Sequence, residues 1–280
     1  MANMLAERIK SVKLTKTQKK IAEYFVQNQD RIGSLSSLDV AHEIGVSDAS
    51  IIRFSRVIGY DGFADLKSHI YDSLVENANN RVTLTERLFQ NKEKYGSTED
   101  SLNFIEVMQQ NIASVFRDNR PEDFERVVDH VVKARKRYVI GLRGCKGIAL
   151  QFGRLLSFMA PGVYTILDSE CTSVNLMQDI KKNDVVVMFV YSRFYRMDEQ
   201  YLKMARKRGA KICLIVNDIT GPLNIYADEV LVVASANLSF FHSTIALDLL
   251  SEYLLDQISE RLEYKERLLE RDEVTEHQRL

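Results

Sequence analysis

The chain has 280 residues, of which 45% are hydrophobic and 28% are charged, and its formal net charge is −1 at pH 7. These values describe an ordinary soluble globular chain, long enough for two domains. The near-neutral charge gives no support to a general polyanion binder, so electrostatics permits DNA binding without arguing for it.

The cysteines and the hydropathy of the chain give no indication of a metal-binding, disulfide-rich or membrane protein. Cys145, Cys171 and Cys213 are far apart and odd in number, which matches neither a zinc site nor a disulfide framework. We expect reduced thiols, no bound metal and no cofactor. No apolar run reaches the ~18 residues of a membrane span, and the N-terminus lacks a signal-peptide pattern. We therefore expect a cytoplasmic protein that does not contact a membrane.

Residues 1–77 are predicted to form an all-helical domain. Thr15 and Gln18 have the spacing of a capping box, which predicts a helix start. The segment 37–56 reads as two short helices joined at Gly45, where a positive φ is easiest to supply. Apolar residues recur at helical spacing on one side of both helices, namely Val40, Ala41, Ile44, Ile51, Phe54 and Ile58. This pattern predicts a helix-turn-helix in residues 37–56.

The outer face of the second helix of this motif carries residues suited to DNA. A step of 100° per residue places Ala49, Arg53 and Arg56 opposite the apolar stripe, with Ile52 at its edge. Arginine side chains suit bidentate contacts to guanine or to phosphate. Ser47 occupies the expected N-cap, where its hydroxyl can accept a backbone N–H. We predict DNA contacts from Ser47, Asp48, Ala49, Ser50, Ile52, Arg53 and Arg56.

Two observations keep other interpretations of this region open. A basic cluster precedes the motif and can flank a backbone contact, although such a run is more often a solvated face; its members are Arg8, Lys10, Lys13, Lys16, Lys19 and Lys20. Helix-turn-helix matches also arise by chance, in helical hairpins that only pack within a domain.

Residues 78–120 are predicted to form a helical connector, which can equally serve as a dimer contact. The segment is polar up to a break around Gly96, and a helix is expected from Ser101 to Phe116. Pro121 then opens the next helix, because proline is tolerated in a first turn.

After Pro121 the pattern changes to alternating strands and helices. The Val- and Ile-rich runs RYVIGL, GVYTIL, DVVVMFVY, KICLIVN and DEVLVVA lack polar alternation, which is typical of strands buried on both faces of a parallel sheet. We predict an α + α/β protein with a doubly wound parallel-sheet domain in residues 121–260. A terminal helix from about Ser243 is expected to run into a charged helical tail, residues 261–280.

Two loops follow strands at the edge where open α/β sheets bind ligands. Residues 141–147 read GLRGCKG, whose glycines let backbone N–H groups approach an anion at a helix N-terminus. The spacing is not G-x-G-x-x-G, so no dinucleotide site is predicted. Residues 191–196 read YSRFYR, whose hydroxyl and arginines suit a phosphate or carboxylate. The alternative is that both loops only close the sheet edge.

The segment GVSDASIIRFSRVIGYDGFADLK resembles the recognition segment of the RpiR-type transcriptional regulators. The α/β half resembles their sugar isomerase (SIS) domain, so the resemblance covers nearly the whole chain. It implies a homodimer or tetramer that binds double-stranded operator DNA, pseudopalindromic for a dimer. It also implies that a small anionic effector, a sugar phosphate, alters DNA binding.

The α/β half departs from the family pattern at two positions. Where the phosphate loop often reads G-x-G-x-S, Cys145 replaces the hydroxyl with a poor donor, and Tyr195 stands where threonine is common. The effector can therefore be a phosphosugar or another anion, or the pocket can be mainly structural. We expect the effector site to contain Arg143, Gly144, Cys145, Ser192, Arg193, Arg196 and His242.

The rival function is a sugar-phosphate isomerase with an appended helical domain. Its chemistry requires a general base near the reacting carbon, and Glu170 and His242 are the candidates near strand ends. No convincing acid–base pair is present, so we favour a regulator that is not an enzyme. A third alternative is a helix-turn-helix used only for protein contacts.

Overall fold

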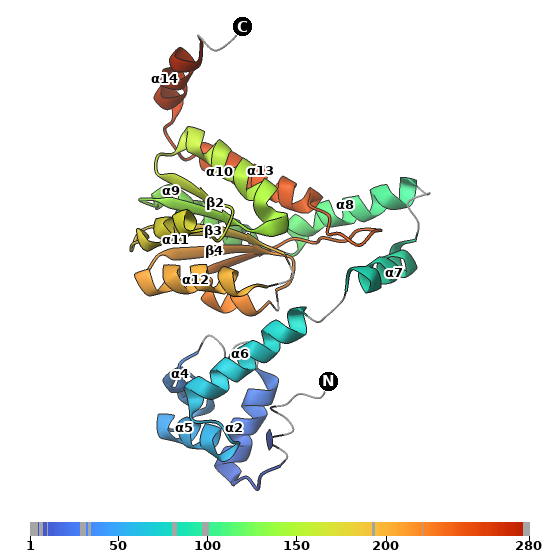
Figure 1. Ribbon diagram of the computed structural model, residues 1–280, viewed down its shortest axis with the longest axis vertical. Helices are drawn as coiled ribbons and strands as arrows, with labels where there is room; N and C mark the ends of the chain where they lie inside the picture. Colours follow the sequence, from blue (N-terminus) through green and yellow to red (C-terminus); the bar gives the residue numbers. More distant parts are fainter. Residues whose placement is uncertain are drawn as a thin grey trace. The chain divides into compact units, whose positions relative to one another are not determined.

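The computed structural model describes residues 5, 8–9, 11–28, 32, 35–79, 83–96, 101–191, 194–219 and 221–276, with the side chains of 27, 71 and 73–79 left aside. Contacts within the chain define two compact units (Figure 1). The first contains residues 1–80 and 220–225, and the second contains residues 81–219 and 226–280. Each unit is described separately.

The first unit is helical. Its helices include α2 (Lys16–Gln27), α4 (Ser37–Ile44), α5 (Asp48–Val57) and α6 (Phe63–Asn79). The predicted capping box opens α2, because the Gln18 amide donates to Thr15 Oγ1 and the Thr15 amide donates to Gln18 Oε1. The buried core includes Phe25 and Phe54, whose ring centroids lie 5.5 Å apart.

The turn between α4 and α5 has the predicted geometry. Gly45 ends α4 with φ +73, and the six apolar residues expected on the inner face are all buried. Ser47 is the N-cap of α5, as predicted, but its hydroxyl makes no cap bond and instead pairs with the Ser50 hydroxyl at 2.8 Å. The predicted bond from a backbone N–H to the Ser47 hydroxyl is therefore wrong, while the helix-turn-helix itself is present.

The second unit contains a parallel sheet with the order β2-β1-β3-β4-β5. The strands are β1 (Arg137–Gly141), β2 (Val163–Ile166), β3 (Val185–Val190), β4 (Lys211–Val216) and β5 (Glu229–Val232). Each strand lies within one of the five predicted runs. Every residue of β1 and β3 is buried, which explains why these runs show no polar alternation.

Helices cover both faces of this sheet (Figure 1). On one face lie α9 (Pro121–Lys133), α10 (Lys146–Met159) and α13 (Ile245–Ser259), and on the other lie α11 (Cys171–Gln178) and α12 (Arg196–Arg208). Val139 and Val187 pair across β1 and β3 and share a core with Phe152 and Leu250. The doubly wound fold predicted from the sequence is thus confirmed.

The helices α7 (Leu84–Tyr95) and α8 (Ser101–Arg117) occupy much of the expected connector. Val115 of α8 belongs to the core of the sheet domain, whereas α7, whose side chains all lie in the described part of the chain, has none that is buried. Where the connector ends and the α/β domain begins stays a prediction.

The C-terminal region differs from the single long helix expected. A break after α13 separates it from α14 (Lys265–Glu276), since α13 ends at its C-cap Glu260. Within the described residues, no helix is long and apolar enough to cross a membrane.

Candidate DNA interface and ligand pocket

The outer face of α5 exposes the two arginines that the sequence places there. Arg53 and Arg56 are exposed, while Ile51 and Phe54 are fully buried on the opposite side. Their described hydrogen bonds are long, at 3.5 Å from Arg53 Nη2 to Ser50 Oγ and 3.4 Å from Arg56 Nε to the Asp61 carbonyl. Both guanidinium groups can therefore turn toward a phosphate or a base edge at little cost.

The other predicted DNA residues are less uniform in exposure. Ser47 and Ala49 are exposed, whereas Asp48 and Ser50 are half-buried. Ile52 is half-buried against the core, as expected for a residue at the edge of the face. Oδ1 of Asp48 is buried without a hydrogen-bond partner among the described residues, so that oxygen is poorly placed to accept from a base.

The N-terminal part of α2 places three lysines of the predicted basic cluster beside α5. One hollow beside α5 is lined by Lys16, Lys19 and Lys20 together with Ser47 and Ser50. A second is lined by Thr15, Thr17, Gln18, Arg53 and Arg56. Thr15, Thr17 and Gln18 were not predicted to contact DNA, although the capping box at Thr15 marks a helix N-terminus, which attracts anions.

A cavity of about 500 Å³ opens at the carboxyl ends of β1 and β3 in the second unit. It is lined by Leu84, Arg87, Leu142, Arg143, Gly144, Cys145, Phe189, Val190, Tyr191, Tyr195, Asp198, Phe240, Phe241, His242 and Thr244. The lining includes four predicted effector residues, namely Arg143, Gly144, Cys145 and His242. Arg196 is exposed on the first turn of α12 and is not in the lining. Ser192 and Arg193 lie outside the described residues.

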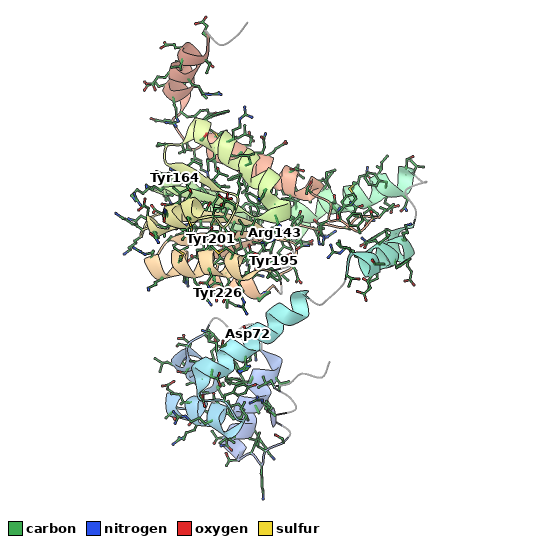
Figure 2. All side chains as sticks on the ribbon, viewed as in Figure 1. Asp72, Arg143, Tyr164, Tyr195, Tyr201 and Tyr226 are labelled. Atoms are coloured by element: carbon green, nitrogen blue, oxygen red, sulfur yellow. The ribbon has the colours of Figure 1, made fainter. Side chains whose placement is uncertain are left out.

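Arg143 is one of two arginines in the lining of this cavity. Its Nη2 donates to Asp198 Oδ2 at 2.7 Å, and its guanidinium lies 3.4 Å from the centroid of the Tyr195 ring (Figure 2). Asp198 is 1% exposed and also accepts the Tyr195 amide, which caps the N-terminus of α12. An anion entering the cavity must compete with Asp198 for Arg143.

Burial and charge act in opposite directions on Asp198. Burial raises the pKa of this carboxyl, and the neighbouring Arg143 guanidinium partly opposes the rise. Asp198 was not predicted from the sequence, because the pairing joins the loop after β1 to the first turn of α12, 55 residues further along the chain.

Cys145 and Gly141 have structural roles at the first loop. Burial raises the pKa of the Cys145 thiol to about 11, so the group is a neutral, weak donor near pH 7. A Cβ on Gly141 would lie 2.4 Å from the Cys145 carbonyl oxygen and 2.5 Å from Ala149 Cβ. Close packing of α10 on β1 accounts for glycine at 141, rather than the approach of an anion that the sequence suggested.

His242, another residue of the lining, is held by two contacts. Its Nδ1 lies 2.9 Å from Ser235 Oγ, and its ring meets the Tyr191 ring edge-to-face at 5.6 Å between centroids. Glu170, the other candidate base, is an exposed N-cap residue of α11 and is not in the cavity lining. Across the described ranges, no group of three or more His, Cys, Asp or Glu side chains is placed to hold a metal ion.

The fold and these two surfaces define a helix-turn-helix protein with a SIS-type α/β domain. Residues 3–77 match the family model for the helix-turn-helix domain of the rpiR family, and residues 130–251 match that for the SIS domain. Together the two matches cover most of the chain in the expected order. The chain belongs to the RpiR-type transcriptional regulators.

Individual relatives agree with this assignment. An HTH-type transcriptional regulator of Haemophilus influenzae is 24% identical over 251 residues, which cover 88% of this chain and 84% of that protein. The sugar isomerase domain of an RpiR transcription factor from Sphaerobacter thermophilus matches with a TM-score of 0.55 and 22% identity, over 64% of this chain and 98% of that one. Vibrio vulnificus NanR complexed with ManNAc-6P matches with a TM-score of 0.51 and 20% identity, over 98% of both chains. The two structures show a shared fold.

Proposed function

We propose that this regulator binds operator DNA through α5 and the first turn of α2, and that a small anionic effector in the SIS cavity alters that binding. The observation that carries the proposal is the presence in one chain of two solvent-facing arginines on the second helix of a helix-turn-helix and a cavity lined by Arg143 at the strand ends. A sugar phosphate is the effector class that we favour. The cavity volume of about 500 Å³ is within the usual range for small-molecule sites, and the similar NanR chain was solved with ManNAc-6P.

A homodimer would present two α5 helices to the DNA. Recognition helices related by a two-fold axis contact half-sites about one turn, ~34 Å, or a multiple of it apart. The expected operator is therefore pseudopalindromic. A tetramer would contain two such pairs.

The test is fluorescence anisotropy of the full chain on DNA from its own upstream region, at several salt concentrations. If Arg53 reads a base, we expect Arg53→Ala to cost ~1–3 kcal/mol at one base position of the operator. A loss that is equal across all sequences would instead make Arg53 a phosphate contact. Arg208→Ala, which removes an exposed arginine from α12, is the matched control and should leave DNA binding unchanged.

The same titration is repeated with a panel of sugar phosphates. A compound that shifts operator binding by wild type identifies the effector. Binding that stays weak and sequence-independent in wild type and Arg53→Ala alike would reject the regulator as proposed.

The alternative is a sugar-phosphate isomerase, and the cavity favours a binding site over a catalytic one. The carboxylate in its lining, Asp198, is bonded to Arg143 and to the Tyr195 amide. His242 is bonded to Ser235, and Glu170 lies outside the lining. Isomerisation requires a general base that can reach a carbon acid. We therefore expect no turnover of sugar phosphates; turnover lost in His242→Ala would support the enzyme instead.

A further inference from the structure

One wall of the cavity comes from α7, a helix that precedes the sheet domain in sequence. Leu84 and Arg87 of α7 line the cavity together with Arg143, although they lie more than fifty residues before it. α6, the last helix of the helix-turn-helix unit, ends at Asn79, and α7 begins at Leu84. α7 is therefore the helix of the second unit that follows the helix-turn-helix unit most closely in sequence, and it forms part of the cavity.

α7 is attached to the sheet domain by a narrow stripe. Its half-buried side chains are Arg87, Leu88, Asn91 and Tyr95, which recur at helical spacing on one face. Arg87 Nη1 donates to the Phe240 carbonyl at 3.3 Å, and Asn91 donates to the Ser239 carbonyl. Because no side chain of α7 is buried, little apolar area is lost from water when the helix docks.

The segment 235–242, whose carbonyls accept hydrogen bonds from α7, is also hydrogen-bonded to α8 and to other residues of the sheet domain. Asn111 of α8 exchanges two hydrogen bonds with the backbone of Ala236, at 2.8 and 3.1 Å. Ser235 lies next in the chain and bonds both Asn217 and His242. The segment 235–242 is thus held firmly on the sheet domain, while α7 is the lightly held partner of the contact.

The charges on the cavity wall give Arg87 a role in ligand binding. Arg143 is already bonded to Asp198, so its charge is partly neutralised before a ligand enters. Arg87 adds a second guanidinium, whose five N–H donors allow it to keep the Phe240 carbonyl and also hold an anion.

We propose that Arg87 binds the anionic group of the effector and that effector occupancy fixes α7 on the sheet domain; this rests on the proposed function. A ligand that contacts both α7 and the domain body has higher affinity for the docked state, so it shifts the population toward that state. Since α7 follows α6 in the chain, its docking restrains the positions open to the helix-turn-helix unit. Arg87 is then the residue that links the pocket to DNA binding.

The test is hydrogen–deuterium exchange of the full chain with inorganic phosphate, glucose 6-phosphate or ManNAc-6P as probe. We expect a bound probe to slow exchange both in residues 142–145 and in α7. Arg87→Ala should weaken the binding of the probe by roughly tenfold to a hundredfold and remove the effect on α7. Arg87→Lys should restore part of the affinity, because the charge is kept while the fork of donors is lost.

Two variants separate ligand contact from docking. Lys92→Ala removes an exposed cation from the same helix outside the cavity lining and should behave as wild type. Asn91→Ala removes a docking bond but keeps Arg87, so α7 should exchange faster without probe and regain protection with it.

The outcomes distinguish this inference from the proposed function. Protection of residues 142–145 without any change in α7, with equal affinity in wild type and Arg87→Ala, would overturn the role of Arg87 and leave the effector site standing. If no probe protected any cavity residue of the wild-type protein, both the proposed anionic effector site and the role of Arg87 would be rejected.

Discussion

Arg143 shows how a single side chain can be held ready in a ligand cavity. Its backbone has φ +51, a left-handed conformation that is uncommon for a residue with a Cβ. A strained backbone conformation of this kind persists only where several surrounding contacts stabilise it. Here the contacts are the bond to Asp198 and the stacking on Tyr195, which together point the guanidinium at the cavity.

Asp198→Asn should strengthen anion binding with little change in the stability of the fold. The amide keeps an acceptor for the Tyr195 N–H but removes the charge that competes for Arg143, so affinity for sulfate should rise roughly tenfold. The change in stability should stay within about 1 kcal/mol, because the Arg143 side chain is 41% exposed and the buried carboxylate loses hydration that the neutral amide does not need. Isothermal titration calorimetry and thermal denaturation measure the two effects.

Acidification should mimic this substitution. Burial raises the pKa of Asp198, so the carboxyl takes up a proton as the pH falls toward that pKa and releases Arg143. Wild type should then bind sulfate more tightly at lower pH, and Asp198→Asn should lack this component. Asp256→Asn on α13, outside the cavity lining, is the control. Weaker sulfate binding in Asp198→Asn would mean that Asp198 positions Arg143 rather than competing for it.

At the scale of elements, α2 and α7 begin with the same kind of N-terminal cap but differ in how many of their side chains are buried. α2 and α7 both begin with a capping box, formed by Thr15 with Gln18 and by Thr83 with Glu86. α2 contributes Ile21 and Phe25, which are fully buried, whereas α7 contributes no buried side chain. The cap of α2 therefore supports a packed core, and the cap of α7 supports the helix alone.

Removing each cap should consequently have different effects. Thr15→Ala should cost the helix-turn-helix unit about 1 kcal/mol and lower its unfolding temperature. Thr83→Ala removes an equivalent cap but should only speed amide exchange in the first turn of α7. Thermal denaturation and hydrogen exchange report the two responses, and each variant is the control for the other. A matching drop in unfolding temperature in Thr83→Ala would show that α7 belongs to the cooperative core.

At the scale of the whole molecule, the chain has two units with separate cores. Ile51 belongs to the core of the helix-turn-helix unit, and Val187 belongs to the core around the sheet. Contacts within each unit define it without the other, so each can respond to a core substitution by itself.

Ile51→Ala should abolish DNA binding and spare ligand binding. Truncation of a fully buried isoleucine costs ~2–5 kcal/mol, a large share of the stability of a small helical domain. We expect two calorimetric transitions, of which only the one assigned to the first unit moves. Val187→Ala in the central strand should move the other transition. A single transition shifted by both variants would contradict independent unfolding.

Local sequence patterns determined most of the fold. The capping box at Thr15, the turn at Gly45 and the five unalternated strand runs each depend on neighbours within a few residues or on burial of both faces. Such patterns can be recognised in the sequence without the tertiary structure. The resemblance of the motif around Arg53 to RpiR-type regulators was confirmed by the helix-turn-helix family model, and that of the α/β half by the SIS model.

The composition of the ligand cavity was decided by the tertiary structure. Arg143 and His242 were predicted as site residues and do line the cavity, whereas Arg196 was predicted and lies outside the lining, and Arg87 and Asp198 were not predicted. The position of a loop at a strand end can be predicted from the apolar run before it, because the carboxyl ends of parallel strands lie at one edge of the sheet. The pairing of Arg143 with Asp198, 55 residues away in sequence, and the contribution of α7 to the lining depend on how separate elements pack. No local pattern contains that information, so the pocket appears only when the chain is folded.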